Sequence, residues 1–267
     1  MKDISELVGF PVTLNDDGTL TFGHGVLSPR PEARKLKDAS PVLLYPDQGG
    51  PETLYLMYRG TGLEKDQNAM INSGLRFDLT VIYPGKIGSE YVKTFGHYHP
   101  LAPGQAFTYP EVYQVIHGKA HFLMQKGGDI TGEVEDFVVA DFEEGDILLI
   151  PPFYGHATVN PGNDFLVIAN WIAREFASVY EPIRVRKGMA YYDVEYKDKS
   201  IFMPNDSYSN HPKPRLEKPK SFPELGLRQG VSMYRAWQEG AKLDFLVKPV
   251  LYQELWKSIG IEPGERH

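Results

Sequence analysis

The sequence contains no cysteine among its 267 residues. This absence excludes disulfide bonds, thiolate metal ligands and cysteine nucleophiles, and it is typical of proteins that work in a reducing compartment. The chain also lacks any apolar run of the roughly 20 residues needed to cross a bilayer. Residues 1–6 contain acidic side chains, and no hydrophobic stretch typical of a signal peptide follows them. Together these features predict a soluble, cytoplasmic protein that does not bind membranes.

The sequence has no excess of positive charge either. Its 28 Lys and Arg residues are outnumbered by 35 Asp and Glu residues, which gives a net charge of −7. This balance argues against a general affinity for nucleic acid. The content of 42% hydrophobic and 12% aromatic residues is that of an ordinary globular protein. A chain of this length can bury one sizeable core, so one or two domains are expected.

The middle of the chain has the pattern of an all-β protein. Strands are expected at residues 42–45, 53–58, 75–83, 91–99, 111–117, 120–125, 133–140, 147–150 and 164–171. The segments between them carry Gly, Pro, Asn or Asp, which favour turns. Many short strands joined by such turns predict a sandwich or a barrel.

The two ends of the chain have different patterns. Residues 10–22 alternate around Asp17-Gly18, which predicts a hairpin, and residues 32–37 predict a short helix before Pro41. Residues 197–220 are rich in charge and proline, which predicts a linker or an extended arm.

Two helices are expected after that linker, near residues 231–239 and from Pro249 to just before Gly260. On the second helix Leu251, Leu255 and Ile259 share one face. We interpret this face as packing on the barrel or on a partner subunit, because about 45 residues make a poor independent core. The expected organisation is an N-terminal arm at 1–40, a β-barrel catalytic domain at 41–195, and a linker with a helical extension at 196–267.

Three histidines and one glutamate form the strongest chemical signal in the sequence. His97 and His99 lie two residues apart on an expected strand, so their side chains point to the same face. Glu111 follows after the length of a loop, and His156 comes soon after an apolar strand and Pro151-Pro152. An H-x-H pair alone is weak evidence, but all four residues in this order indicate a site for one divalent ion. Such a ligand set suits Fe(II), Mn(II), Ni(II) or Zn(II).

The other histidines lack this context, and we interpret them as surface or hydrogen-bonded core residues rather than ligands. They are His24, His117, His121, His211 and His267.

The order of the four candidate ligands resembles the cupin metal site, and a longer match narrows the resemblance. The matching strings are Thr80-Val81-Ile82-Tyr83-Pro84-Gly85-Lys86, Glu90-Tyr91-Val92-Lys93-Thr94-Phe95-Gly96-His97-Tyr98-His99, Glu111-Val112-Tyr113, Pro151-Pro152-Phe153-Tyr154-Gly155-His156 and Thr158-Val159-Asn160. From about residue 34 to Tyr180 the chain resembles the cupin-type glucose-6-phosphate isomerases of archaea and some bacteria. Two departures from the archaeal members of this family are expected. The loop before Glu111 is longer than theirs by residues 102–106, and the residues from about 196 onward have no counterpart in them.

The resemblance implies a double-stranded β-helix, an active homodimer and a role in glycolysis and gluconeogenesis. It implies that His97, His99, Glu111 and His156 hold one metal ion per subunit, with iron favoured. It also implies that the sugar phosphate is held by residues in four matching positions: Thr80, Thr94, the backbone of Gly96, and Tyr113. Tyr55 and Tyr180 match residues near the sugar, although each is equally typical of an ordinary core tyrosine.

A regular strand conflicts with this assignment. Strict alternation would place Thr94 and Gly96 on the face opposite His97 and His99, so that phosphate and metal could not share one cavity. A bulge or kink at Gly96 would remove the conflict, and bulges re-aim side chains beside active sites. We therefore expect irregular backbone at residues 95–97.

The reaction implied is the exchange of glucose 6-phosphate and fructose 6-phosphate through a cis-enediol, with Glu111 as the base. A hydride shift from C2 to C1 is the rival route, and mannose 6-phosphate is a possible additional substrate because C2 epimers share the enediol. Two other classes stay open from the residues alone: a non-haem iron dioxygenase with the same ligands, and a non-catalytic sugar-binding cupin.

Overall fold

The longest apolar runs of the chain form the central strands of two sheets. The computed structural model describes residues 1–129 and 131–261. In sheet order, the strands of the first sheet are β14 (Ile147–Ile150), β11 (Glu111–His117), β16 (Leu166–Ala173), β8 (Leu75–Ile82), β6 (Thr53–Tyr58) and β5 (Glu32–Lys35). Those of the second are β15 (Tyr154–Val159), β12 (Lys119–Gly127), β13 (Val134–Glu143) and β19 (Arg215–Glu217).

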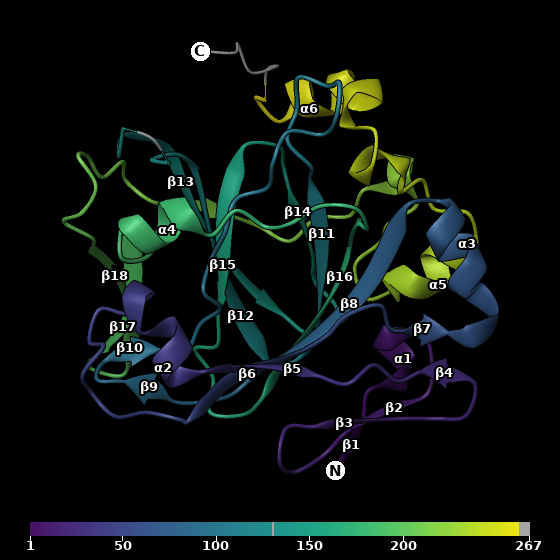
Figure 1. The fold of residues 1–267 in the computed structure, drawn as a ribbon, viewed down its shortest axis with the longest axis horizontal. Coiled ribbons are helices and arrows are strands. Elements are labelled where there is room, and N and C mark those ends of the chain that lie inside the picture. Colours follow the sequence, from purple (N-terminus) through teal and green to yellow (C-terminus); the bar gives the residue numbers. More distant parts are fainter. Residues whose placement is uncertain (130, 262–267) are drawn as a thin grey trace.

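The two sheets face each other and enclose one large apolar core (Figure 1). Every residue of β16 and of β14 is buried, which explains why these strands are apolar on both faces. The chain is therefore an all-β protein with the cupin double-stranded β-helix, as the sequence predicts.

Smaller sheets and short helices surround this barrel. The remaining strands are β1 (Lys2–Asp3), β2 (Val12–Leu14), β3 (Leu20–Phe22), β4 (Val26–Leu27), β7 (Gly62–Leu63), β9 (Lys86–Ile87), β10 (Glu90–Tyr91), β17 (Tyr191–Tyr196) and β18 (Lys199–Pro204). The α-helices are α1 (Ser5–Val8), α2 (Leu36–Ala39), α3 (Gln67–Asn72), α4 (Glu181–Val185), α5 (Met233–Gln238) and α6 (Gln253–Ser258). The 3-10 turns are Ser40–Val42, Glu64–Asp66, Pro223–Leu225, Asp244–Leu246 and Pro249–Tyr252. None of the helices among the described residues is long and apolar enough to cross a membrane.

The predicted N-terminal hairpin is confirmed, since β2 pairs with β3 around the Asp17-Gly18 turn. The predicted helix at residues 32–37 is wrong in its first half. Residues 32–35 form the edge strand β5, because pairing with β6 satisfies their backbone groups, and the helix begins only at Leu36.

The strand expected at residues 42–45 is also wrong. Two buried charges, Glu90 and Lys93, pair at 2.8 Å, and each also bonds this segment. Lys93 Nζ donates to the carbonyl of Val42 at 2.6 Å, and the N–H of Leu44 donates to Glu90 at 2.8 Å. These side chains thus form hydrogen bonds with backbone groups that would otherwise bond to a neighbouring strand. The ion pair thereby ties residues 42–44 to the chain just before the histidines.

The predicted arm at residues 197–220 is more ordered than its composition indicates. β18 pairs along its whole length with β17, and β19 adds to the edge of β13 in parallel. Main-chain hydrogen bonds therefore compensate for a composition that is poor in apolar residues.

Both predicted C-terminal helical regions are present, but the expected apolar face of the second is wrong. Leu251 is 66% exposed, whereas Trp256 is fully buried and donates from its indole nitrogen to the carbonyl of Pro249 at 2.6 Å. The first turn of this region, Pro249–Tyr252, is a 3-10 turn with about three residues per turn. This tighter winding rotates Leu251 away from the face that Leu255 and Ile259 share.

The C-terminal region also contacts the long loop before β11. Gln105 of that loop donates from Nε2 to the carbonyl of Val247 at 3.3 Å. Its Oε1 accepts from the N–H of Val250 at 3.1 Å. Further along the barrel, Trp171 stacks on Tyr234 of α5 with ring centroids 5.7 Å apart. The C-terminal helices are therefore packed on the barrel of the same chain.

We expect Trp256→Ala to lower the free energy of unfolding by about 3–5 kcal/mol, because it removes a fully buried indole. Leu251→Ala, in the same C-terminal region, serves as the matched control and is expected to change it by no more than about 0.5 kcal/mol, because Leu251 faces solvent. Urea denaturation followed by circular dichroism measures both. Equal effects of the two substitutions would contradict the packing described for this region.

Candidate metal centre

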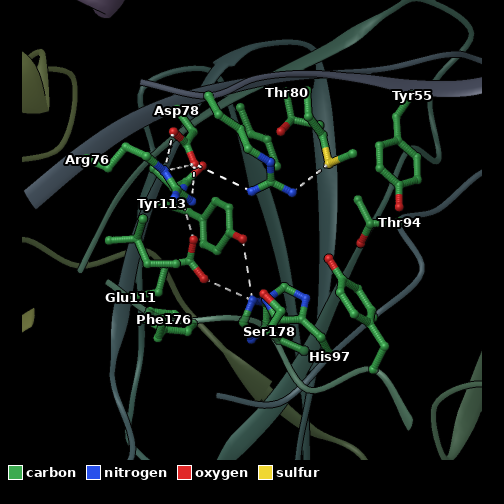
Figure 2. A pocket seen from close by; sticks show the side chains of 18 of the residues that line it. Tyr55, Arg76, Asp78, Thr80, Thr94, His97, Glu111, Tyr113, Phe176 and Ser178 are labelled. Atoms are coloured by element: carbon green, nitrogen blue, oxygen red, sulfur yellow. Dashed lines mark hydrogen bonds and ion pairs between the residues drawn. The ribbon is translucent and has the colours of Figure 1, made fainter. Parts of the chain in front are cut away.

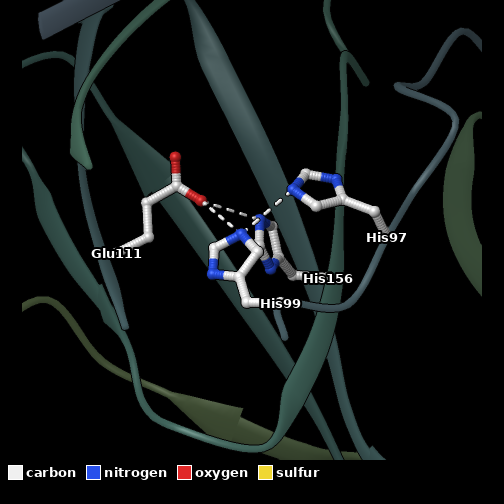
Figure 3. Close-up of side chains that lie close together, drawn as sticks. All are labelled: His97, His99, Glu111 and His156. Carbon is white, nitrogen blue, oxygen red and sulfur yellow. Dashed lines mark hydrogen bonds and ion pairs between the residues drawn. The ribbon is translucent and has the colours of Figure 1, made fainter. Parts of the chain in front are cut away.

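Four side chains from three parts of the chain meet inside the barrel. They are His97, His99, Glu111 at the start of β11 and His156 on β15, and one ligand atom of each lies within 4.8 Å of the others. The Nε2 atoms of His97 and His99 are 3.1 Å apart, and Glu111 Oε2 lies 3.4 Å from His99 Nε2 and 3.1 Å from His156 Nε2 (Figure 3). The structure thus brings together all four residues that the sequence predicts as ligands.

The backbone around Gly96 makes this convergence possible. The strand expected at residues 91–99 ends at Tyr91, and Gly96 has a φ of +82°, in the left-handed region that favours glycine. After this kink the chain forms a single bridge in which His97 and His156 exchange backbone hydrogen bonds of 3.1 and 3.0 Å. The predicted irregularity at residues 95–97 is therefore confirmed.

A second glycine fixes the segment between the two neighbouring histidines. Tyr98 packs directly over Gly155, where a Cβ atom would lie only 2.5 Å from the ring. The Tyr98 hydroxyl donates to the carbonyl of Gly127 at 2.7 Å and accepts from Gln125 Nε2 at 2.6 Å. Because Tyr98 is anchored on the far side, His97 and His99 on either side of it turn towards the centre.

Neighbouring polar groups orient two of the four candidate ligands. His99 Nδ1 lies 2.8 Å from the carbonyl of Tyr109, which makes this nitrogen the protonated donor and leaves Nε2 with a lone pair facing the centre. Asn170 Nδ2 donates to Glu111 Oε1 at 2.7 Å. The other oxygen, Glu111 Oε2, is buried and receives no hydrogen bond from the described residues. An unbonded oxygen among three imidazole nitrogens fits a bound cation.

The protonation states of the cluster also fit a cation. Burial lowers the pKa of His97 and of His156, so both imidazoles are neutral at pH 7. Burial opposes ionisation of Glu111, but the imidazoles of His156 and His99 close to its Oε2 outweigh this effect and hold the pKa of Glu111 well below its usual range. Neutral imidazoles and an ionised carboxylate are the forms that bind a divalent metal.

The cluster forms one end of a cavity of about 300 Å³. All six residues predicted to contact the sugar phosphate line this cavity together with His97, Glu111 and His156 (Figure 2). They are Tyr55, Thr80, Thr94, Gly96, Tyr113 and Tyr180. A cavity of this size is at the lower end of the range for small-molecule sites.

Strand register builds the cavity wall in rows. Thr80 on β8 pairs with Met57 on β6 and with Ile168 on β16. One row further along, Asp78 pairs with Asn170, which in turn pairs with Tyr113 on β11. Since alternate residues of a strand face the same side, each row points into the cavity about 6.6 Å from the next.

Several donors in the cavity are available to a ligand. The Thr94 hydroxyl accepts from the N–H of Thr158 at 3.0 Å, which leaves its hydrogen free to donate. The buried N–H of Gly96 has no acceptor within the described ranges. Burial and the charge of Glu111 raise the pKa of Tyr113 well above its usual value, so its hydroxyl stays protonated, 3.4 Å from His156 Nε2. These groups suit an oxygen-rich, negatively charged ligand.

Sequence reasoning missed five polar residues of this cavity, and four of them lie on its strands or directly beside them: Arg59, Arg76, Asp78 and Asn170. Alternation along the predicted strands contained the signal for three of them. Arg76 and Asp78 share a face with Thr80, and Asn170 lies on the expected strand 164–171. The fourth, Arg59, follows directly after the last residue of β6 and continues the alternation of Tyr55 and Met57.

The other described histidines lie outside the cluster, each with its own surroundings. His121 is paired with buried Asp193 at 2.5 Å, His117 lies 3.2 Å from Asp164, and His211 contacts the carbonyl of Asn205 at 2.9 Å. His24 is exposed, and His267 lies outside the described residues.

Comparison with known proteins agrees with this geometry. The family model described as glucose-6-phosphate isomerase (GPI) matches residues 33–210. The chain is 29% identical over 166 residues to a glucose-6-phosphate isomerase of Thermococcus litoralis, covering 61% of this chain and 75% of that protein. It is 32% identical over 130 residues to that of Thermococcus gammatolerans, covering 47% of this chain and 61% of that protein.

Among solved structures, the chain is similar to a recombinant oxalate oxidase in complex with glycolate. The TM-score is 0.36 and the identity 13%, over 48% of this chain and 56% of that one. A similarity of this size carries no argument about function. The family match, in contrast, covers well over half of the chain and includes all four residues of the cluster. The chain therefore belongs to the glucose-6-phosphate isomerase family, a family of enzymes.

Proposed function

We propose that this protein interconverts glucose 6-phosphate and fructose 6-phosphate with the help of one divalent metal ion. The observation that carries the proposal is the shared cavity: three of the four candidate metal ligands, His97, Glu111 and His156, line one end of it, and hydroxyl and amide donors suited to a phosphate line the rest. A dioxygenase with the same ligands would not need those donors, and a storage-type cupin would not need the full ligand set. Neither alternative therefore accounts for the whole cavity.

In this proposal the ion is held by His97, His99, Glu111 and His156. When bound, it supplies Lewis-acid stabilisation of the oxygen that becomes negatively charged as the enediol forms. His₃Glu ligation is compatible with Fe(II), Mn(II), Ni(II) and Zn(II), and the family resemblance favours iron. Iron as the native metal, a homodimeric assembly and a cytoplasmic location stay predictions.

The substrate phosphate lies, in this proposal, against the hydroxyls of Thr80 and Thr94 and the N–H of Gly96, with the Tyr113 hydroxyl as a further donor. Tyr55 and Tyr180 form the adjoining wall. Phosphate is a dianion near neutral pH, and hydrogen bonds to a charged acceptor are the strong kind. Gly96 lets the phosphate approach the main chain closely because it carries no side chain. Binding at this end directs C1 and C2 of the open-chain sugar towards Glu111.

Glu111 is the proposed base. It removes the proton from C2 of the open-chain aldose; the C2–H electron pair forms the C1–C2 double bond while the carbonyl π pair moves to O1, which gains a proton. The O2 hydroxyl then loses its proton, C2=O forms, and the proton held by Glu111 is delivered to C1 to give the ketose. Its low pKa keeps it ionised and ready to accept a proton, but also makes it a weak base. The reaction then requires that C2–H be acidified by charge stabilisation at the neighbouring oxygen. The hydrogen bond from Asn170 holds the carboxylate in place during this transfer.

Chelation is expected to abolish turnover of fructose 6-phosphate in a coupled assay, and readdition of a divalent ion is expected to restore it. His97→Ala and His156→Ala are each expected to lower both metal content and rate, because each removes one of four ligands. His24→Ala, at an exposed histidine outside the cavity, is the control. Full metal content and full rate in either ligand variant would overturn the assignment.

Glu111→Gln is expected to lower the rate by about 10²–10⁴-fold, the usual size of a general-base contribution, while part of the metal is retained. The amide keeps an oxygen for the ion but cannot accept the C2 proton. Metal analysis and the coupled assay on the same preparation measure the two effects, with exposed Glu254→Gln as the control. An unchanged rate in Glu111→Gln would show that another group acts as the base.

Isomerisation in deuterium oxide is expected to place solvent deuterium at C1 of fructose 6-phosphate, since a proton held by Glu111 exchanges with water before it is returned. Mass spectrometry of the product measures this incorporation. Complete turnover without incorporated deuterium would instead favour transfer of hydride from C2 to C1.

A further inference from the structure

The cavity contains two arginines, and they are held very differently. Four of the residues that line it carry a formal charge: Arg59, Arg76, Asp78 and Glu111. Arg76 is fully engaged by Asp78, with Nε 2.9 Å from both carboxylate oxygens and Nη2 2.9 Å from one of them. Asp78 itself is 4% exposed and also accepts from the N–H of Gly60 at 2.8 Å. Arg76 and Asp78 thus form a closed, nearly neutral pair in the wall.

Apart from a hydrogen bond to Tyr180 in the cavity wall, Arg59 makes long or weak contacts with the described residues. Its Nη1 lies 3.9 Å from Asp78, its Nε lies 3.4 Å from the largely exposed carboxylate of Glu32, and its Nη2 donates to the sulfur of Met57 at 3.4 Å. A thioether sulfur is a weak acceptor. Arg76 already neutralises the charge of Asp78. The positive charge of Arg59 is therefore only weakly paired, and its N–H groups are available to donate hydrogen bonds to a ligand.

The guanidinium of Arg59 also reaches towards the proposed phosphate end. Arg59 follows Tyr58, which pairs with Leu79, so its backbone lies beside the Asp78 row. Its Nη2 nevertheless contacts Met57, which belongs to the Thr80 row. Burial lowers the pKa of Arg59, but Asp78, Glu32 and Tyr180 outweigh it and keep the side chain charged. The side chain is 35% exposed, so it can shift towards a ligand.

We propose that Arg59 is a further phosphate-binding residue, whose guanidinium bonds the phosphate group held by Thr80, Thr94 and Gly96. This inference rests on the proposed function, because it assumes a phosphorylated sugar in the cavity. It adds a full positive charge to a site whose other proposed donors, the hydroxyls of Thr80 and Thr94 and the N–H of Gly96, are neutral.

Electrostatics supports this assignment. A dianion that leaves water for a buried cavity loses its hydration, and neutral hydroxyl and amide donors replace that loss only in part. A guanidinium adds a charge-assisted hydrogen bond and has the fork geometry that matches two phosphate oxygens. The contacts that Arg59 would give up, to a sulfur and to an exposed carboxylate, are weak ones.

The test is the affinity for glucitol 6-phosphate, a substrate-like ligand that has no carbonyl and cannot be isomerised. Calorimetry compares wild type, Arg59→Met, Arg59→Lys and Arg184→Met in the metal-loaded protein, with unphosphorylated glucitol as the second ligand. Arg184 is the matched control, because it lies over the Phe95 ring close to the site but outside the cavity lining. Thermal melting and metal content establish that each variant is folded and loaded.

Arg59→Met is expected to weaken glucitol 6-phosphate binding by about ten- to a hundredfold, the usual loss for a hydrogen bond to a charged group. Arg59→Lys is expected to lose less, because it keeps the charge but not the fork, and Arg184→Met is expected to bind as wild type does. In turnover, Arg59→Met is expected to raise KM for fructose 6-phosphate more than it lowers kcat. Should Arg59→Met not fold, Arg59→Gln replaces it in the same comparison.

Unchanged affinity for glucitol 6-phosphate in the folded variant would overturn the inference. An equal loss for glucitol and for glucitol 6-phosphate would also overturn it, since Arg59 would then bind sugar hydroxyls and not phosphate. The proposed function fails separately: a wild-type protein that binds glucitol 6-phosphate but leaves fructose 6-phosphate unchanged contradicts the isomerase proposal and not the phosphate contact.

Discussion

The candidate centre depends on one pair of backbone hydrogen bonds, exchanged between His97 and His156. These residues are far apart in the sequence, and this bridge, together with the one between Lys93 and Val159, places an irregular segment beside the regular strand β15. Side-chain anchors secure it from both directions. Tyr98 is fixed over Gly155, and the buried Glu90–Lys93 pair ties down the chain that leads into it. The histidines are thus positioned by rigid neighbours, as a site that binds an ion tightly requires.

The opposite wall follows a simpler rule, because it consists of alternate residues on strands in register. β6, β8, β16 and β11 contribute side chains to the same rows, and in one of these rows polar residues of neighbouring strands meet. Asp78 beside Asn170, and Asn170 beside Tyr113, form such a row across three strands. The bond from Asn170 to Glu111 shows that this regular wall also orients a residue of the centre.

Local sequence patterns predicted much of this molecule, and the failures have physical causes. The convergence of the four candidate ligands and most barrel strands were predictable, because period-two alternation is a local signal. The kink at Gly96 followed from the conflict between that alternation and the phosphate contacts that the family resemblance implies. The strand expected at 42–45 was wrong because distant Glu90 and Lys93 take its backbone groups, which no local pattern reveals. Leu251 was assigned to the buried face of the C-terminal helix, but it is exposed, because the 3-10 turn at Pro249–Tyr252 has fewer residues per turn than an α-helix. The domain boundaries at 40/41 and 195/196 stay predictions, although β5 and β19 contribute to the barrel sheets from outside them.

The long loop before β11 and the C-terminal region touch each other through both ends of the Gln105 amide. That same loop continues to Tyr109, whose carbonyl orients His99. The loop and the C-terminal region therefore brace one another through a single side chain. Removal of the C-terminal region would leave the loop without this support, in a span that runs directly into the candidate ligands.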